Sequence, residues 1–204
     1  LHTVPYGGDD RQDLEALLSK ATEVDAKVLC ASRRGLSSYC ICQLPDPLPT
    51  LALARRSRSD VVNPDNPSGT WHSACSLEAL VERLPLGCLL VIDEAYHELG
   101  VDFDANAKVA VDDLRVLRLR TFSKGYGLAG CRIGYALGAL EIISAFDRIR
   151  NHFGINRISQ AGALAALADQ PYLAEVRERI GTAREILGEI AAAHGLRALP
   201  SATN

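Results

Sequence analysis

Apolar residues recur along much of the chain with the period of an α-helix. Positions three and four apart predict helices over residues 13–22, 77–84, 142–149, 158–168 and 171–194. The Ala- and Leu-rich composition of 158–168 is compatible with a buried helix. Pro171 lies near the start of the last helix, and Gly195 can end it. The predicted core face of this helix comprises Leu173, Val176, Ile180, Ala183, Leu187 and Ile190.

Shorter apolar runs between these helices predict strands at 26–31, 88–92, 116–119 and 132–137. Residues 88–92 (CLLVI) are almost continuously apolar, as expected of a strand buried on both faces. Strands that alternate with helices predict an α/β domain with a mostly parallel sheet flanked by helices. Ligands bind at the carboxyl ends of strands in such sheets, so Asp93 is placed to meet one. A helix-capping role is the alternative for Asp93.

No hydrophobic period holds through residues 32–60. This stretch contains Arg33-Arg34, prolines at 45, 47 and 49, and the run Arg55-Arg56-Ser57-Arg58. A structureless stretch of this length is uncommon inside a compact domain. It could be a basic binding loop or an insertion without function. We favour the insertion because runs of charge are usually solvated.

Composition narrows the classes of function. The 204 residues carry a net charge of −3, which gives no electrostatic argument for binding nucleic acid. No apolar run is long enough to span a membrane, so we expect no membrane partner. The six cysteines are scattered, and Cys40-x-Cys42 has the wrong spacing for a zinc knuckle. We therefore expect reduced thiols, no metal site and a cytoplasmic location.

The stretch Thr121–Gly134 (TFSKGYGLAGCRIG) carries the most specific chemistry. Lys124 offers an amine that can form a Schiff base with a carbonyl group. Thr121, Ser123 and Arg132 offer hydrogen-bond donors suited to a phosphate. An amine nucleophile beside a phosphate site predicts an aldehyde cofactor that carries a phosphate, namely pyridoxal 5′-phosphate.

The same stretch also matches a dinucleotide-binding pattern, Gly125-x-Gly127-x-x-Gly130. That pattern should open a helix and be followed, about 20 positions later, by an acidic residue. The segment after it resembles a second strand instead, so dinucleotide binding is the weaker alternative.

Three motifs stand in order along the chain: NPDNPSGT at 63–70, VIDEAY at 91–96 and TFSKGYGLAGCRIGY at 121–135. Together they resemble the class I/II (fold type I) pyridoxal-phosphate aminotransferases, and most of all the histidinol-phosphate aminotransferases. The resemblance implies transfer of an amino group between an amino acid or amino-phosphate and a 2-oxo acid, in amino-acid biosynthesis. It also implies a homodimer. A related pyridoxal-phosphate decarboxylase or lyase, and an inactive truncated fragment, are the alternatives.

The resemblance implies two central roles in the reaction. Lys124 would form the Schiff base with the cofactor and, once freed by the substrate, carry a proton between the substrate and the cofactor. Asp93 would pair with the pyridine nitrogen and keep it protonated, so that the ring acts as an electron sink.

The resemblance also implies the residues that hold the rest of the cofactor. Asn66 and Tyr96 would form hydrogen bonds with the phenolic oxygen of the ring. Thr121, Ser123 and Arg132 would bind the phosphate.

The resemblance finally predicts how the chain is organised. Residues 1–204 would form a large cofactor-binding domain that is incomplete at both ends, and 171–204 would lead toward a small domain that lies outside the chain. Residues 32–62 are an atypical insertion, because in the family the preceding strand runs straight into the NPxNP loop. Either this insertion loops out and the site survives, or the loop is displaced and Asn66 is lost.

Overall fold

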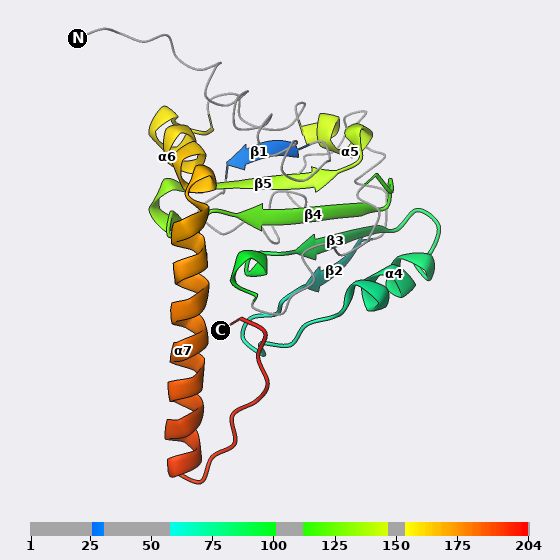
Figure 1. Ribbon diagram of the computed structural model, residues 1–204. Coiled ribbons are helices and arrows are strands. Elements are labelled where there is room, and N and C mark those ends of the chain that lie inside the picture. The colour runs from blue at the N-terminus through cyan, green and yellow to red at the C-terminus, as the bar shows by residue number, and fades with distance from the viewer. Residues whose placement is uncertain (1–25, 31–57, 101–111, 147–153, 204) are drawn as a thin grey trace, which may run out of the picture.

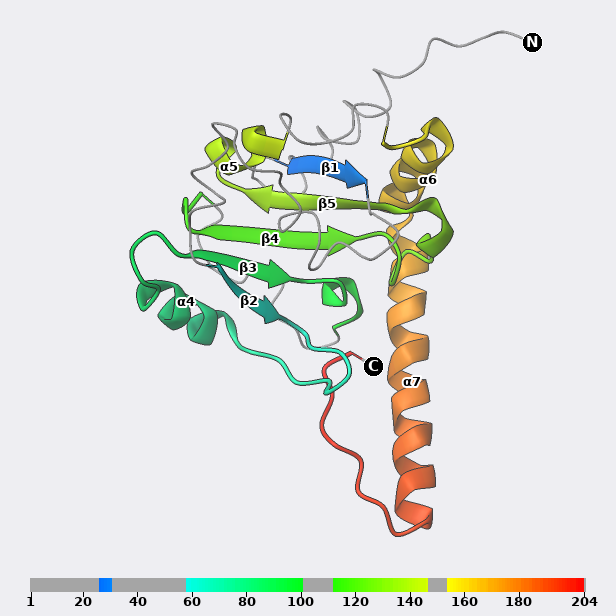
Figure 2. The same ribbon diagram turned by 180° about the vertical axis from the view of Figure 1, so that it is seen from behind.

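A computed structural model describes residues 26–30, 58–100, 112–146 and 154–203, and the predicted helix at 13–22 lies outside them. Its five strands are β1 (Ala26–Cys30), β2 (Arg58–Val62), β3 (Leu89–Asp93), β4 (Val116–Thr121) and β5 (Ile133–Gly138). They form one sheet in the order β1-β5-β4-β3-β2 (Figures 1 and 2). The predicted strands at 26–31, 88–92, 116–119 and 132–137 are thereby confirmed to within two residues at each end.

The sheet is mostly parallel, as the sequence predicts. Strand β3 is parallel to β2 and to β4. Strand β5 is antiparallel to both of its neighbours, β4 and β1. Four strands therefore run in one direction, and their carboxyl ends lie along one edge of the sheet.

The described helices are α4 (Ala74–Glu82), α5 (Leu140–Ala145), α6 (Arg157–Ala168) and α7 (Gln170–Ala193). Side chains cap three of them. Ser73 accepts a hydrogen bond from the amide of Ser76 at the start of α4, and Asn156 and Asp169 do the same for α6 and α7. Helix α7 ends before Gly195, which has a φ of 69° and lets the chain turn away.

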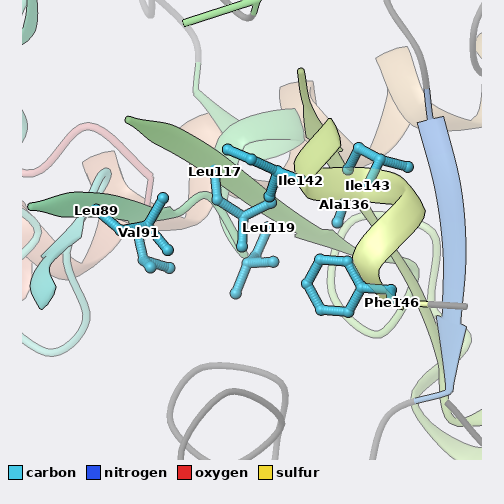
Figure 3. Packing of buried hydrophobic residues seen from close by; sticks show 8 residues of the cluster. All are labelled: Leu89, Val91, Leu117, Leu119, Ala136, Ile142, Ile143 and Phe146. Carbon is cyan, nitrogen blue, oxygen red and sulfur yellow. The ribbon is translucent and has the colours of Figure 1, made fainter. Parts of the chain in front are cut away.

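One face of the sheet packs against α5. Leu89 and Val91 of β3 and Leu117 and Leu119 of β4 point to this face, where they meet Ile142 and its neighbours on α5 (Figure 3). The predicted apolar face of this helix is confirmed at Ile142 and Phe146, and Ile149 lies outside the described residues.

The opposite face carries two apolar clusters. The first joins Leu77 and Val81 of α4 to residues of β3 and β4. The second joins residues of the turn after β4, of β5 and of helices α6 and α7, namely Phe122, Tyr126, Ile133, Tyr135, Leu137, Ala163 and Leu173. The alternating positions of β3 thus contribute to both faces, which explains why its sequence is continuously apolar.

The predictions for the two C-terminal helices are right in position but wrong in burial. On α7 only Leu173 is buried, whereas Leu187 and Ile190 are 64% and 50% exposed. The physical reason is length, since α7 extends well beyond the sheet and only its first turns reach the core (Figure 1). On α6, Ile158 is 82% exposed, so this helix is buried along one side only.

Strand β2 corrects the interpretation of residues 32–60 as uniformly aperiodic. Arg58–Asp60 form its first three residues and pair with Leu89–Val91 of β3. The pattern misses this strand because β2 is the edge strand, and Ser59 and Asp60 are exposed rather than alternating with buried apolar residues. The strand runs directly into the loop that begins at Asn63.

A further property concerns membranes. In the part of the chain that the structure describes, no helix combines the length and the apolar character needed to cross a bilayer.

Candidate functional site

The strand register brings the predicted site residues to one edge of the sheet. Asp93, the last residue of β3, pairs with Val62 of β2 on one side and Leu119 of β4 on the other. Two backbone bonds extend this alignment beyond the strands: Asn63 donates to Asp93 O at 2.9 Å, and Glu94 donates to Leu119 O at 2.8 Å. The loops after β2, β3 and β4 therefore start side by side, as expected of a ligand site in an α/β sheet.

The loop after β2 is held in shape by its own polar groups. Asn63 is fully buried, and its side chain accepts from His72 N at 2.7 Å and donates to His72 O at 3.1 Å. Inside this loop, Asp65 N donates to Thr70 O at 2.8 Å and Gly69 N donates to Asp65 O at 3.0 Å. The loop thus stays attached to the sheet edge although residues 32–62 precede it.

Asn66 lies at the exposed tip of this loop. Its side chain makes no hydrogen bond with another residue in the ranges described, so its amide is available to a ligand. Among the described residues, no hydrogen bond joins Asn66 to Lys124 or Tyr96. The structure thus joins the start of the loop to Asp93 through the backbone of Asn63, whereas the Asn66 side chain forms no hydrogen bond with the other predicted residues.

Asp93 has a turn-forming role. Its Oδ1 atom accepts a hydrogen bond from Ala95 N at 3.0 Å, which holds the chain where it leaves β3. The side chain is half-buried. This bond closes a turn and differs from the helix-capping role considered as the alternative, because the short helix that follows is preceded by Tyr96 and has no side-chain cap.

Lys124 and Tyr96 meet at this edge. The Nζ atom of Lys124 lies 5.0 Å from the centroid of the Tyr96 ring, within the range of a cation–π contact. Lys124 is exposed, but its turn is anchored by the fully buried Phe122. Gly127 N donates to Lys124 O at 2.9 Å, and the φ of 70° at Gly127 favours glycine there.

The three predicted phosphate-binding residues flank this turn. Thr121 Oγ1 accepts from Ser123 N at 3.1 Å, so the Thr121 hydroxyl already shapes the turn. Arg132 adopts a left-handed conformation with a φ of 51°, and its side chain is exposed and donates to Ala129 O at 2.8 Å. Thr121 pairs with Gly134 across β4 and β5, which places Arg132 next to the start of the turn.

A buried charge network beside the site is not predicted by the sequence analysis. Glu94 accepts from Arg118 Nε at 2.9 Å and from Arg120 Nε at 2.8 Å, and its side chain is 1% exposed. Burial alone would raise the pKa of Glu94, but Arg120 and Arg118 outweigh burial and lower the pKa to about 2. The network ties the carboxyl ends of β3 and β4 together. The signal in the sequence is the pair of arginines at alternate positions of an otherwise apolar strand.

Two more ionisable groups are buried just after this network, in the short 3-10 helix η1 (His97–Leu99). Burial is the main reason that the pKa of His97 falls to about 3 and that the pKa of Glu98 rises to about 7. Neither carboxyl oxygen of Glu98 has a hydrogen-bond partner. A Cβ atom at Gly125 would lie 3.2 Å from the Glu98 Cβ, so the lysine turn packs closely on η1.

The structure contradicts the dinucleotide alternative. The last glycine of Gly125-x-Gly127-x-x-Gly130 lies within a short 3-10 helix, η2 (Ala129–Cys131), and the strand β5 starts two residues after this helix, at Ile133. No α-helix therefore starts at this turn to present its N-terminus to a diphosphate.

Comparison with known proteins identifies relatives of this chain. The family described as Aminotransferase class I and II matches residues 59–204. An aromatic amino acid aminotransferase of Nocardia farcinica is 41% identical over 148 residues, which cover 71% of this chain and 41% of that protein. A histidinol-phosphate aminotransferase of Staphylococcus saprophyticus is 41% identical over 144 residues, which cover 70% of this chain and 40% of that protein. The chain thus spans about two fifths of the length of these curated relatives.

Solved structures agree with these relatives. The histidinol-phosphate aminotransferase of Sinorhizobium meliloti, in complex with pyridoxal-5′-phosphate, superposes with a TM-score of 0.84 at 34% identity, over 98% of this chain and 66% of that one. An L-threonine-O-3-phosphate decarboxylase of Porphyromonas gingivalis superposes with a TM-score of 0.73 over 98% of this chain and 71% of that one. Its identity is 18%, so this second likeness shows the fold alone.

Proposed function

Because this chain belongs to the class I and II aminotransferase family, we propose that it forms the cofactor site of a pyridoxal-phosphate-dependent aminotransferase. The reaction moves an amino group between an amino acid or amino-phosphate and a 2-oxo acid. The observation that carries the proposal is the position of Lys124, whose exposed amine lies over the Tyr96 ring at the sheet edge where β3 ends in Asp93.

The residues at this edge fit the chemical groups of the cofactor. The amine of Lys124 can bind an aldehyde carbon, and the carboxylate of Asp93 can accept a hydrogen bond from a protonated pyridine nitrogen and so keep it protonated. When bound, pyridoxal phosphate supplies an electron-withdrawing ring that stabilises negative charge on the carbon next to the amino group. Lys124 holds the cofactor and, when the substrate frees its amine, carries the proton that must leave that carbon.

Hydrogen-bond donors supply the remaining contacts. The exposed amide of Asn66 and the hydroxyl of Tyr96 donate to the phenolic oxygen of the ring. Ser123 and Arg132 donate to the phosphate, and Thr121 orients Ser123 through the 3.1 Å bond to its amide. Arg132 carries a positive charge that offsets the charge of the phosphate.

The relatives support a choice of substrate class. Curated proteins that are about 40% identical include histidinol-phosphate aminotransferases and an aromatic amino acid aminotransferase. We therefore propose a donor with an aromatic or imidazole side chain, with an amino-phosphate of the histidinol-phosphate type as the first candidate. Decarboxylation or lyase chemistry is the second candidate, and an inactive fragment is the third.

Further proposals follow from the family. Residues 1–204 belong to a large cofactor-binding domain, residues 171–204 lead toward a small domain, and the protein acts as a homodimer in the cytoplasm.

The test of the proposed activity is a donor panel. Purified protein with added pyridoxal phosphate is given histidinol phosphate, aromatic amino acids and other amino acids with a 2-oxo acid, and both transferred amine and released carbon dioxide are measured. Amine transfer that is lost in Lys124→Ala supports the proposal. Carbon dioxide without amine transfer would identify a decarboxylase, and no turnover by a folded, cofactor-loaded preparation would support the inactive fragment.

A further inference from the structure

The segment after α7 returns to the loop that carries Asn66. Figures 1 and 2 show residues 196–203 leaving the far end of α7 and ending beside the turn that follows β2. The contact is a backbone hydrogen bond, in which Ala202 N donates to Gly69 O at 3.0 Å. Residues far apart in the sequence are thus joined next to the proposed cofactor site.

Gly69 is shaped to receive this segment. Its φ of 70° favours glycine, and a Cβ atom added there would lie 2.5 Å from Ser201 Oγ and 2.6 Å from Ser201 Cβ. No side chain other than hydrogen therefore fits between the loop and Ser201. The contact between the loop and Ser201 therefore requires glycine at position 69.

The segment is also attached on its other side to the long helix. Arg184 of α7 donates from Nη1 to Ala202 O at 3.1 Å. Ala202 therefore uses its amide to hold the loop and its carbonyl to bind the helix. Thr203, the next residue, is fully buried, which shows that the end of this segment is packed rather than loose.

The contact reaches the part of the loop that determines where Asn66 lies. Gly69 N donates to Asp65 O at 3.0 Å, and Asp65 N donates to Thr70 O at 2.8 Å. These two bonds close a turn around Asn66. Because Gly69 belongs to the turn, fixing Gly69 O also fixes the backbone that presents the Asn66 side chain.

We propose that Ser201–Thr203 is a positioning segment that braces the Asp65–Thr70 turn from α7 and thereby holds Asn66 in place for the cofactor. The inference rests on the proposed function for its last step, because Asn66 matters only if this loop binds pyridoxal phosphate. The bracing of the turn is a property of the chain without any cofactor, so it can be tested separately.

The first variant removes the hydrogen bond and leaves the loop sequence unchanged. Ala202→Pro lacks the amide hydrogen that Gly69 O accepts. Ala198→Pro is the matched control, since residue 198 lies in the same segment, is exposed and forms no hydrogen bond with any residue in the described part of the chain. Amide exchange is measured on cofactor-free protein at Asp65 and Gly69. We expect exchange to be roughly fivefold faster in Ala202→Pro, because a factor of about five corresponds to the loss of one net hydrogen bond. We expect no change in the control.

A second variant removes the hydrogen bond between α7 and Ala202 instead. It provides an independent test if the proline disturbs folding. Arg184→Met removes the donor to Ala202 O, and Arg184→Lys retains a donor and should restore slow exchange. Arg179→Met is the control, because Arg179 lies on the same helix and pairs at the surface with Glu175.

Affinity for pyridoxal phosphate then tests the step through Asn66. Weaker binding is expected in Ala202→Pro and Arg184→Met, with no additional loss when Asn66→Ala is combined with either variant. Unchanged exchange at Asp65 and Gly69 would overturn the bracing. The proposed action through Asn66 would be overturned by faster amide exchange without a change in the affinity for pyridoxal phosphate. It would also be overturned if the losses of affinity in the combined variants were the sum of the losses in the single variants. If the unaltered protein binds no cofactor at Lys124, the proposed function fails, while the exchange data still decide the bracing.

Discussion

Asn63 closes the loop at the edge of the sheet by binding both backbone groups of one residue, His72. Its Oδ1 accepts from His72 N at 2.7 Å, and its Nδ2 donates to His72 O at 3.1 Å. The Asn63 side chain is fully buried, whereas His72 lies at the surface. One amide side chain thus fixes the two ends of the loop that contains Asn66.

Replacing Asn63 should loosen this loop. Asn63→Ala removes both hydrogen bonds to the His72 backbone, and at about 0.5–1.5 kcal/mol for each bond we expect a loss of about 1–3 kcal/mol in the free energy of unfolding. Asn63→Asp keeps the acceptor but places a carboxylate oxygen against His72 O at a buried position, so its loss at neutral pH should be at least as large. Urea unfolding measures both variants. Equal stability of Asn63→Ala and the parent protein would show that the two bonds contribute nothing to the fold.

Glu94 should be essential for the stability of the sheet edge. Glu94→Gln leaves Arg118 and Arg120 buried without a carboxylate, which should cost about 3–5 kcal/mol of unfolding free energy. Asp113→Asn is the control, because it removes a pair with Arg115 near the surface and should cost much less. The folded-state pKa of about 2 lies below the ordinary 4.5, so the contribution of Glu94 is present above pH 4.5 and is lost as the pH falls toward 2. A loss in Glu94→Gln no larger than in the control would contradict this account.

Glu98 should have the opposite pH dependence. Its folded-state pKa of about 7 lies above the ordinary 4.5, so the folded protein holds this proton more tightly than the unfolded chain does. The stability it provides is complete below pH 4.5 and falls as the pH rises through 7. The charged groups Arg120, Arg177 and Glu94 also influence the pKa of Glu98. All three are retained when Glu98 is replaced.

The variant Glu98→Gln tests this behaviour, because glutamine does not titrate. Urea unfolding at several pH values between 4.5 and 7 should show that the free energy of unfolding of the unaltered protein falls as the pH rises, and that it falls less for Glu98→Gln. Parallel stability curves would mean that Glu98 does not titrate in this range.

Packing under the lysine turn gives a prediction about Gly125. A Cβ atom there would lie 3.2 Å from atoms of Glu98, Leu99 and Leu173, which is closer than ordinary packing allows. Gly125→Ala should cost about 1–3 kcal/mol in the free energy of unfolding and should weaken cofactor binding by moving Lys124. Gly130→Ala is the matched control, because nothing lies within 4 Å of the added atom. Equal stability and cofactor affinity of the two variants would contradict the packing argument.

The sequence predicts most of the sheet because its central strands are buried on both faces. The runs that form β3, β4 and β5 are apolar enough to be recognised without any structural information. Strand β2 is not recognised, because its first three residues, Arg58–Asp60, are polar and are held by backbone pairing with β3 rather than by apolar packing. The exposure of α7 is not predicted either, because periodicity identifies an apolar face and says nothing about what covers it.

The candidate site likewise contains residues that the sequence predicts and residues that it does not predict. Asp93 is predicted from its place at a strand end, Lys124 from the chemistry of its amine, and Tyr96 from the resemblance to the aminotransferases. The structure brings the three residues to one edge of the sheet. The supporting residues Asn63 and Glu94 are missed, because their partners are fixed by tertiary contacts across the loop and between strands. The contact of Gly69 with Ser201 joins two distant parts of the chain, so no local pattern indicates it.

The most direct test of the account is to locate the covalent bond between protein and cofactor. Pyridoxal phosphate is added to the purified protein, the adduct is fixed with borohydride, and peptide mapping identifies the modified residue. The account predicts a single modified site at Lys124, which is absent in Lys124→Ala together with the cofactor absorbance band. A folded protein that gives no adduct, or an adduct that persists in Lys124→Ala, would contradict the central claim that this lysine holds the cofactor.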